Sequence, residues 1–100
     1  MRTMIKIQVP VDAGNRAIAE NKMGDVIGEI AAKAHPEAMY FGTDPVSGLR
    51  TAHFVCDLAS SSDLPAMFEV AIQKLNATIQ AFPVMTAEEL KSGLGRAMQG

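Results

Sequence analysis

Tryptophan is absent from this chain of 100 residues, cysteine occurs once, and one tyrosine and four phenylalanines are its only aromatic residues. A single cysteine, Cys56, excludes an intrachain disulfide and any metal site built on several thiolates. Its apolar sequence context, with no adjacent base, predicts a small buried side chain rather than a nucleophile. Sparse cysteine is typical of a reducing compartment, so we expect a cytoplasmic protein.

Positive charge is also scarce. Lysine and arginine total 9 against 11 acidic residues, which gives a formal net charge of −2. This balance offers little attraction to a phosphate backbone and argues against a nucleic-acid partner. No segment approaches the roughly 18 apolar residues of a membrane span, so we expect no membrane association.

The composition that remains is that of a globular protein, with 48% hydrophobic and 20% charged residues. A chain of this length buries roughly 60 to 70% of its unfolded surface, which is enough for one core. The sequence therefore predicts a single domain over residues 1–100.

Alternation of apolar and polar residues predicts four strands. The first has Ile5, Ile7 and Val9 on one side and Lys6 and Gln8 on the other. The second is rich in aromatic residues, and the third alternates in the same way as the first. The last contains a proline, which favours the edge of a sheet. The expected strands span residues 4–11, 38–43, 49–58 and 78–85.

Two helical regions connect these strands. In the first, Asn15 is a candidate cap, apolar residues recur every three or four positions over 23–34, and the stretch 21–24 predicts a break. The second follows the serines at 60–62, with apolar residues at 64, 68, 71, 72 and 75. Thr86 and Glu89 form a capping box that predicts a short C-terminal helix. Glycines at 93, 95 and 100 predict fraying of residues 95–100.

This order of elements predicts an α+β fold, the ferredoxin-like split β-α-β arrangement, with an antiparallel four-stranded sheet and both main helices on one face. The opposite face is too apolar for plain solvent exposure and too polar for a core. A twofold partner that presents the same face would cover it and complete a dimeric α/β barrel, so a homodimer is expected. The residues assigned to this face are Met4, Lys6, Gln8, Thr51, His53, Val55 and Asp57, with members of the Tyr40 and Phe82 sets.

Three segments resemble a group of small uncharacterised bacterial proteins of the dimeric α/β-barrel superfamily. They are the entry to the second strand at 36–41, the third strand at 50–55 and the closing segment at 83–90. The resemblance covers residues 3–94 and implies the dimeric barrel fold. Relatives in that superfamily include cofactor-independent quinol monooxygenases, muconolactone isomerase and haem-degrading enzymes, so the resemblance selects no activity. The tryptophan common in several of the monooxygenase and haem-degrading members is missing here.

Candidate chemistry centres on His53, whose imidazole titrates near neutrality and can act as an acid or base on a molecule inside the barrel. The alternative is a histidine that hydrogen-bonds across the dimer interface. Tyr40 offers a hydroxyl to an aromatic ligand or packs in the core, depending on register. Lys6 and Gln8 line the same interior, where the lysine can hold an anionic group; the alternative is that Lys6 lies at the barrel rim.

Thr51 shares the face of His53, and Arg50 carries a fork suited to a carboxylate, although arginines near turns are commonly solvated. No spacing of histidine, cysteine and acidic residues predicts a metal site, and no motif for a cofactor is present.

Two hypotheses therefore remain open. In one, the barrel holds a small apolar or aromatic molecule that His53 and its neighbours orient or protonate without a cofactor. In the other, the barrel interior is filled by side chains, and the protein is a structural or protein-interaction module. The presence of a pocket distinguishes them.

Overall fold

The computed structural model describes residues 1–99. The chain order is β1 (Arg2–Val9), α1 (Val11–Ala19), α2 (Met23–Ala34), β2 (Ala38–Thr43), β3 (Arg50–Asp57), α3 (Asp63–Leu75), β4 (Thr78–Pro83) and α4 (Ala87–Gln99).

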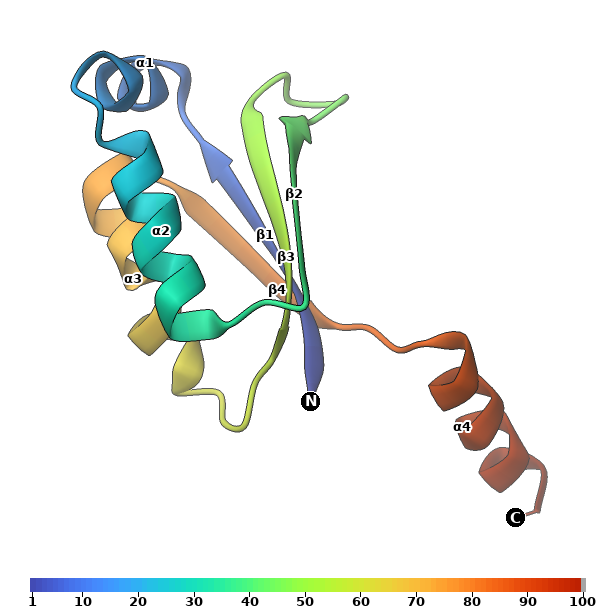
Figure 1. The fold of residues 1–100 in the computed structure, drawn as a ribbon. Coiled ribbons are helices and arrows are strands. Elements are labelled where there is room, and N and C mark those ends of the chain that lie inside the picture. Colours follow the sequence, from blue (N-terminus) through green and yellow to red (C-terminus); the bar gives the residue numbers. More distant parts are fainter. Residues whose placement is uncertain (100) are drawn as a thin grey trace.

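The four strands form one sheet in the order β2-β3-β1-β4, and each neighbouring pair is antiparallel. Helices α1, α2 and α3 cover one face of this sheet, and α4 lies beyond its other side (Figure 1). The predicted α+β class, the ferredoxin-like topology and the placement of both main helices on one face are confirmed. The face that α1 to α3 leave uncovered is called the open face below.

The central strand β1 alternates between buried and partly exposed residues along its whole length. Ile5, Ile7 and Val9 are buried beneath the helices. The strand was predicted over residues 4–11 but ends at Val9. Pro10 has no N–H to continue the pairing, and its extended backbone leads directly into α1.

Helix α1 begins at Val11, earlier than the sequence indicated. The predicted cap Asn15 lies inside the helix, and its side chain accepts a hydrogen bond from Arg50 instead. The predicted break is confirmed. The chain turns at Asn21, whose φ is 57°, before α2 begins at Met23.

Helices α2 and α3 bury one stripe each, formed by Val26, Ile30 and Ala34 and by Phe68, Ala71 and Leu75. The spacing also placed Ile72 in the second stripe, but Ile72 is 40% exposed. It lies at the margin of the stripe, beyond the cover that the sheet provides.

The other two strand predictions differ from the structure only at their ends. β3 loses one residue at each end of the predicted segment, and β4 ends at Pro83 rather than at residue 85. β4 is an edge strand, as its proline predicted. Beyond it, only the N–H of Val84 still bonds to the carbonyl of Arg2, where β1 begins.

Phe54 lies at the centre of the core and is 1% exposed. Its ring meets Phe41 edge-on at 6.1 Å and stacks near Phe68 at 6.2 Å between centroids. Cys56 is buried on the same side of β3, as predicted, and burial raises the pKa of its thiol. This cluster joins the sheet to α3.

Helix α4 begins with the predicted capping box. The N–H of Thr86 donates to Glu89 Oε1 at 2.9 Å, and the N–H of Glu89 donates to Thr86 Oγ1 at 3.1 Å. The helix is longer than predicted, because it continues through Gly93 and Gly95 to Gln99. Residues 95–99, expected to fray, are therefore helical, and Gly100 lies outside the described residues.

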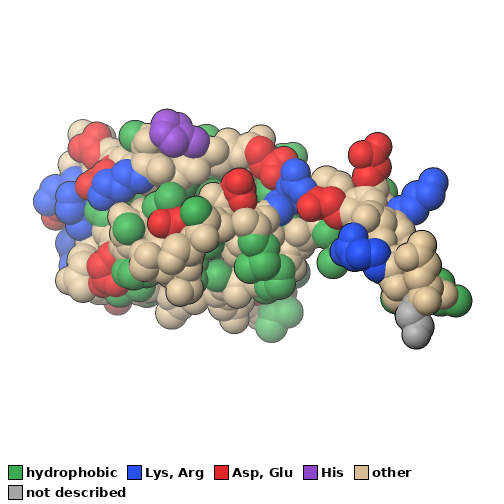
Figure 2. Space-filling view, turned by 90° about the horizontal axis from the view of Figure 1, so that it is seen from below, with side chains coloured by type: hydrophobic (Ala, Val, Ile, Leu, Met, Phe, Trp, Pro, Cys, Tyr) green, Lys and Arg blue, Asp and Glu red, His purple; other side chains and the backbone are tan. Residues whose placement is uncertain are grey.

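No described residue of α4 is buried. The helix stands clear of the body, and charged side chains gather where it leaves (Figure 2). Arg2 pairs there with both Glu37 and Glu89. The radius of gyration is 15.7 Å, whereas a compact chain of this length has about 13 Å.

Among residues 1–99, no helix combines the length and the apolar character needed to span a membrane.

Replacing Phe54 with alanine tests the role assigned to the aromatic cluster. The cavity and the lost contacts should lower the free energy of unfolding by about 3–5 kcal/mol, measured by urea denaturation. Val46→Ala is the matched control, because Val46 is 95% exposed and its truncation should change stability by less than about 0.5 kcal/mol. Equal effects of the two substitutions would contradict the assignment.

Candidate functional site

The strand register brings four polar side chains into one row across the open face. Tyr40, His53, Lys6 and Gln80 lie directly opposite one another on β2, β3, β1 and β4. Facing residues on neighbouring strands have Cβ atoms about 4.5–5.5 Å apart, so adjacent members of the row are within contact distance. The register places Tyr40 on the open face, and its neighbours Met39 and Phe41 point to the helices.

An apolar row lies beside this polar row, one pleat closer to α4. It consists of Ala38, Val55, Met4 and Phe82. Phe82 is 47% exposed and Tyr40 is 65% exposed. The open face therefore offers both an uncovered apolar strip and a line of hydrogen-bonding groups.

Lys6 is already engaged by the turn between β2 and β3. Its ammonium lies 2.8 Å from Asp44 Oδ1, and the other carboxylate oxygen accepts from the N–H groups of Val46 and Ser47. The Lys6 ammonium and these donors hold the pKa of Asp44 well below its usual range. The ion pair draws the turn over one end of the open face.

A third row, on the other side of the polar row, contains Gln8 and Thr51, and the same turn lies over it. Gln8 Nε2 donates to Ser47 Oγ at 2.9 Å, and Thr51 is buried, with its hydroxyl donating to the carbonyl of Leu49. Lys6, Gln8 and Thr51 therefore hold or underlie the turn. Tyr40 and His53 are the two candidates on this face that the turn does not engage.

Arg50 does not join these residues. It pairs with Val9 in the sheet and points to the helices, because successive strand residues face opposite sides and Thr51 faces the open side. Its Nη2 donates to Asn15 Oδ1 at 2.8 Å. The structure thus brings five of the six predicted residues to one face and places Arg50 on the other.

Metal ligation has no support from the part of the chain that is described, residues 1–99, where no group of three or more histidine, cysteine or acidic side chains converges. His35 ends α2 in the left-handed conformation, with φ 44°, and its backbone N–H bonds to the carbonyl of Ala31. It is remote in the sequence from His53 and lies at the end of α2.

An apolar pocket on the helix-covered side of the sheet was not predicted from the sequence. Its wall residues follow the ordinary periodic pattern of a core, so they carry no functional signal. The one available clue was Arg50, a charged residue at a position where the alternation of β3 requires a side chain that points to the helices.

No protein-family model and no curated protein matches the chain. Among solved structures, it is similar to the de novo designed protein Ferredog-Diesel, with 8% identity, a TM-score of 0.45, and coverage of 83% of this chain and 85% of that one. A dimeric ferredoxin-like protein from an uncultured marine organism shares 13% identity, with a TM-score of 0.43 and coverage of 86% and 96%.

Protein SP2199 from Streptococcus pneumoniae shares 20% identity, with a TM-score of 0.34 and coverage of 95% of this chain and 99% of that one. The assignment to the ferredoxin-like α+β class rests on the topology described above, and these three proteins add no argument about function.

Removal of Lys6 tests its electrostatic role. In a ¹³C NMR titration, Lys6→Met should raise the pKa of Asp44 toward the ordinary value for aspartate, about 3.9. An unchanged Asp44 titration in this variant would show that the lysine does not set the pKa.

The lowered pKa of Asp44 also predicts a pH dependence of stability. Such a group stabilises the fold above its unfolded pKa, and this stabilisation is lost as pH falls through the folded value. Acidification below about pH 4 should therefore lower the Tm of the wild type more than that of Asp44→Asn.

Asp12→Asn, on the exposed side of α1, is the matched control and should follow the wild type on acidification. Equal loss of Tm in the wild type and Asp44→Asn on acidification would contradict the predicted pH dependence.

Proposed function

We propose that the protein is a homodimer in which the open faces of two sheets meet, and that a small apolar or aromatic molecule binds in the barrel interior without a cofactor. The observation that carries the proposal is the polar row formed by Tyr40, His53, Lys6 and Gln80 beside an uncovered apolar strip. Apolar walls with a few convergent polar groups are typical of small-molecule sites.

The exposed side chains support a second copy as the partner. An apolar strip on a free sheet face usually marks an interaction surface, and a twofold partner presents the same strip to it. Met4 and Val55 at the centre of the face would then lose their remaining contact with water, which contributes about 25 cal/mol for each Å² of apolar surface.

Helix α4 supports the same proposal independently. Leu90, Leu94 and Met98 recur every four residues and form one exposed stripe. A helix of 13 residues is marginal in water without packing, so this stripe requires a surface to cover it. Because α4 lies beyond the open side of the sheet (Figure 1), a copy that covers the open face would be within its reach.

Within the dimer, Tyr40 and His53 are the groups available to a ligand. We propose that the imidazole of His53 orients or protonates a polar atom of the bound molecule, and that the Tyr40 hydroxyl donates a second hydrogen bond. Lys6 contributes positive charge nearby while it remains paired with Asp44. The expected setting is the cytoplasm, in keeping with one buried free cysteine.

Sedimentation equilibrium tests the assembly. The wild type should have twice the 10.7 kDa mass of one chain. Phe82→Glu should yield the single-chain mass, because it places a charge in the apolar strip. Ile72→Glu, a partly exposed position on α3, should remain a dimer. A wild type that sediments as a monomer, or a dimer that survives Phe82→Glu, would overturn the proposed interface.

Calorimetric titration with 2-naphthol, an apolar aromatic probe with one hydroxyl, tests the binding site. The wild type should bind the probe, and His53→Ala or Tyr40→Phe should each weaken binding about 2- to 10-fold through the lost hydrogen bond. His35→Asn, which changes the other histidine and suits its left-handed backbone, should bind as the wild type does. Unchanged affinity in His53→Ala would argue against this site.

A structural or protein-interaction module is the second candidate. It is favoured by the engagement of Lys6 and Gln8 with the turn, because polar groups occupied within the chain have less to offer a ligand. A dimer of the proposed kind that gives no heat with 2-naphthol would favour this alternative.

A further inference from the structure

The apolar pocket noted above lies between the sheet and the helices, on the opposite side from the open face. Its volume is about 210 Å³. Ile7 and Phe54 from the sheet and Val26 and Ile30 from α2 form its inner part, and all four are buried. The pocket is independent of the barrel interior and requires no partner subunit.

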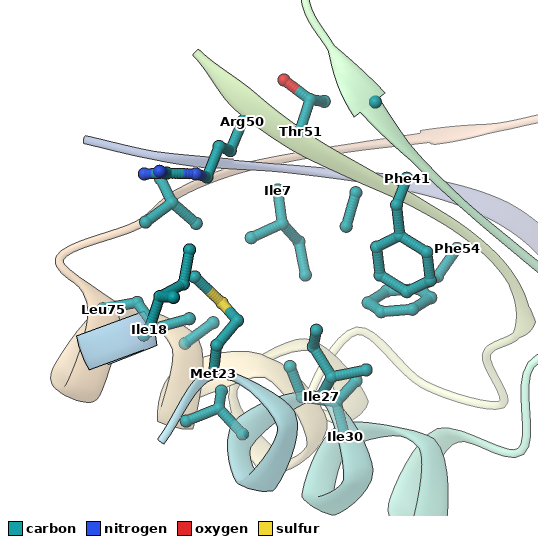
Figure 3. Close-up of a pocket in the computed structure, with 15 residues that line it drawn as sticks. Ile7, Ile18, Met23, Ile27, Ile30, Phe41, Arg50, Thr51, Phe54 and Leu75 are labelled. Carbon is teal, nitrogen blue, oxygen red and sulfur yellow. The ribbon is translucent and has the colours of Figure 1, made fainter. Parts of the chain in front are cut away.

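The pocket opens toward the edge strand β2. Phe41 points to the helical side of this strand, yet it is 56% exposed, and Ile18 on α1 is 50% exposed. Figure 3 shows these side chains with Met23 and Ile27 around an open centre. Large apolar side chains at the mouth and a fully apolar interior make a site that favours an apolar group of matching size.

One charged side chain, Arg50, lies at the rim of this pocket (Figure 3). Its guanidinium is held against α1, where Nη2 donates to Asn15 Oδ1. A Cβ atom at Gly14 would lie 2.5 Å from Arg50 Nη1, so glycine at this position permits the close approach. The hydrogen bond to Asn15 thus places the exposed guanidinium against α1 at the rim of the pocket, and glycine at 14 leaves room for it.

The guanidinium retains unused hydrogen-bonding capacity. An arginine carries five N–H donors, and one of them bonds to Asn15. None of the ion pairs found within residues 1–99 involves Arg50. An arginine fork at the mouth of an apolar pocket, without a carboxylate partner, is suited to bind a planar anion through two parallel hydrogen bonds.

We propose that this pocket binds a small apolar carboxylate, with its hydrocarbon part among the core side chains and its carboxylate on Arg50. The volume sets the size of the ligand. A cavity of about 150 Å³ accepts benzene, so 210 Å³ suits a substituted ring or a chain of about eight carbons. A neutral molecule of the same shape would fill the pocket but leave the Arg50 donors to water.

Calorimetric titration of the full chain with octanoate and with 1-octanol tests the proposal, because the two probes share the chain and differ in the head group. The wild type should bind octanoate at least about tenfold more tightly, as expected for hydrogen bonds to a charged group. Arg50→Gln, which keeps an amide donor for Asn15, should bring the two affinities together. Ile27→Trp, which fills the pocket, should weaken both probes.

Arg16→Gln is the matched control, since Arg16 lies on α1 outside the lining of this pocket, and it should retain the preference for octanoate. 4-Ethylbenzoate and 4-ethylbenzyl alcohol, used in place of octanoate and 1-octanol, separate a ring-binding site from a chain-binding site. A tenfold preference for the carboxylate over its alcohol in either pair supports the proposal. Equal affinities of the wild type for carboxylate and alcohol in both pairs, or full carboxylate affinity in Arg50→Gln, would overturn it.

Methyl NMR of the wild type provides a second measurement that does not depend on the folding of any variant. Octanoate should shift the methyl signals of Ile18, Met23 and Ile27 and leave Met4 on the open face unchanged. Shifts confined to Met4 would overturn this proposal and leave the barrel site intact, whereas failure of 2-naphthol to bind would not affect the octanoate result.

Discussion

The strict alternation of β1 is the constraint on which the rest of this structure depends. Because the strand is central and its side chains alternate without interruption, each residue of β1 is assigned to the core or to the open face. The register then extends this assignment to β3 and β4, and through β3 to β2. A shift of one residue would exchange Ile5 and Ile7 with Met4 and Lys6, at a large cost in buried apolar surface and exposed charge. Both the core and the polar row thus follow from one strand.

The sequence predicted the elements well where periodicity and burial agree. β2 was predicted at its observed bounds, and the break before α2 and the capping box at Thr86 were both found as expected. The errors lie where local signals were ambiguous. Asn15 is a frequent cap, but Pro10 starts α1 earlier, and Asn15 instead binds a side chain 35 residues away in sequence. No single-sequence pattern records such a distant partner.

The candidate site was predictable in part, because strand alternation assigns side chains to faces. Alternation placed His53 and Thr51 on one face, and the register resolved the position of Tyr40. Neither pattern revealed that the turn between β2 and β3 binds Lys6 through Asp44, because that contact depends on how the turn folds over the sheet. Arg50 was predicted as a ligand-binding residue from its fork and its place near the turn, without assignment to a face, and it lies on the helical side because adjacent residues of a strand face opposite sides. The apolar pocket beside Arg50 forms because the helices cover the edge strand β2 incompletely. Composition and periodicity do not predict how far such cover extends.

The contact between Gly14 and Arg50 has a consequence for how this sequence can change. A methyl group at position 14 would occupy the place where the Arg50 guanidinium now lies. Because Nη1 is the far end of a flexible side chain, alanine at 14 is accommodated when the guanidinium moves aside. A side chain added to α1 at this point would therefore displace the charge at the mouth of the pocket and leave the apolar wall of that pocket as it is.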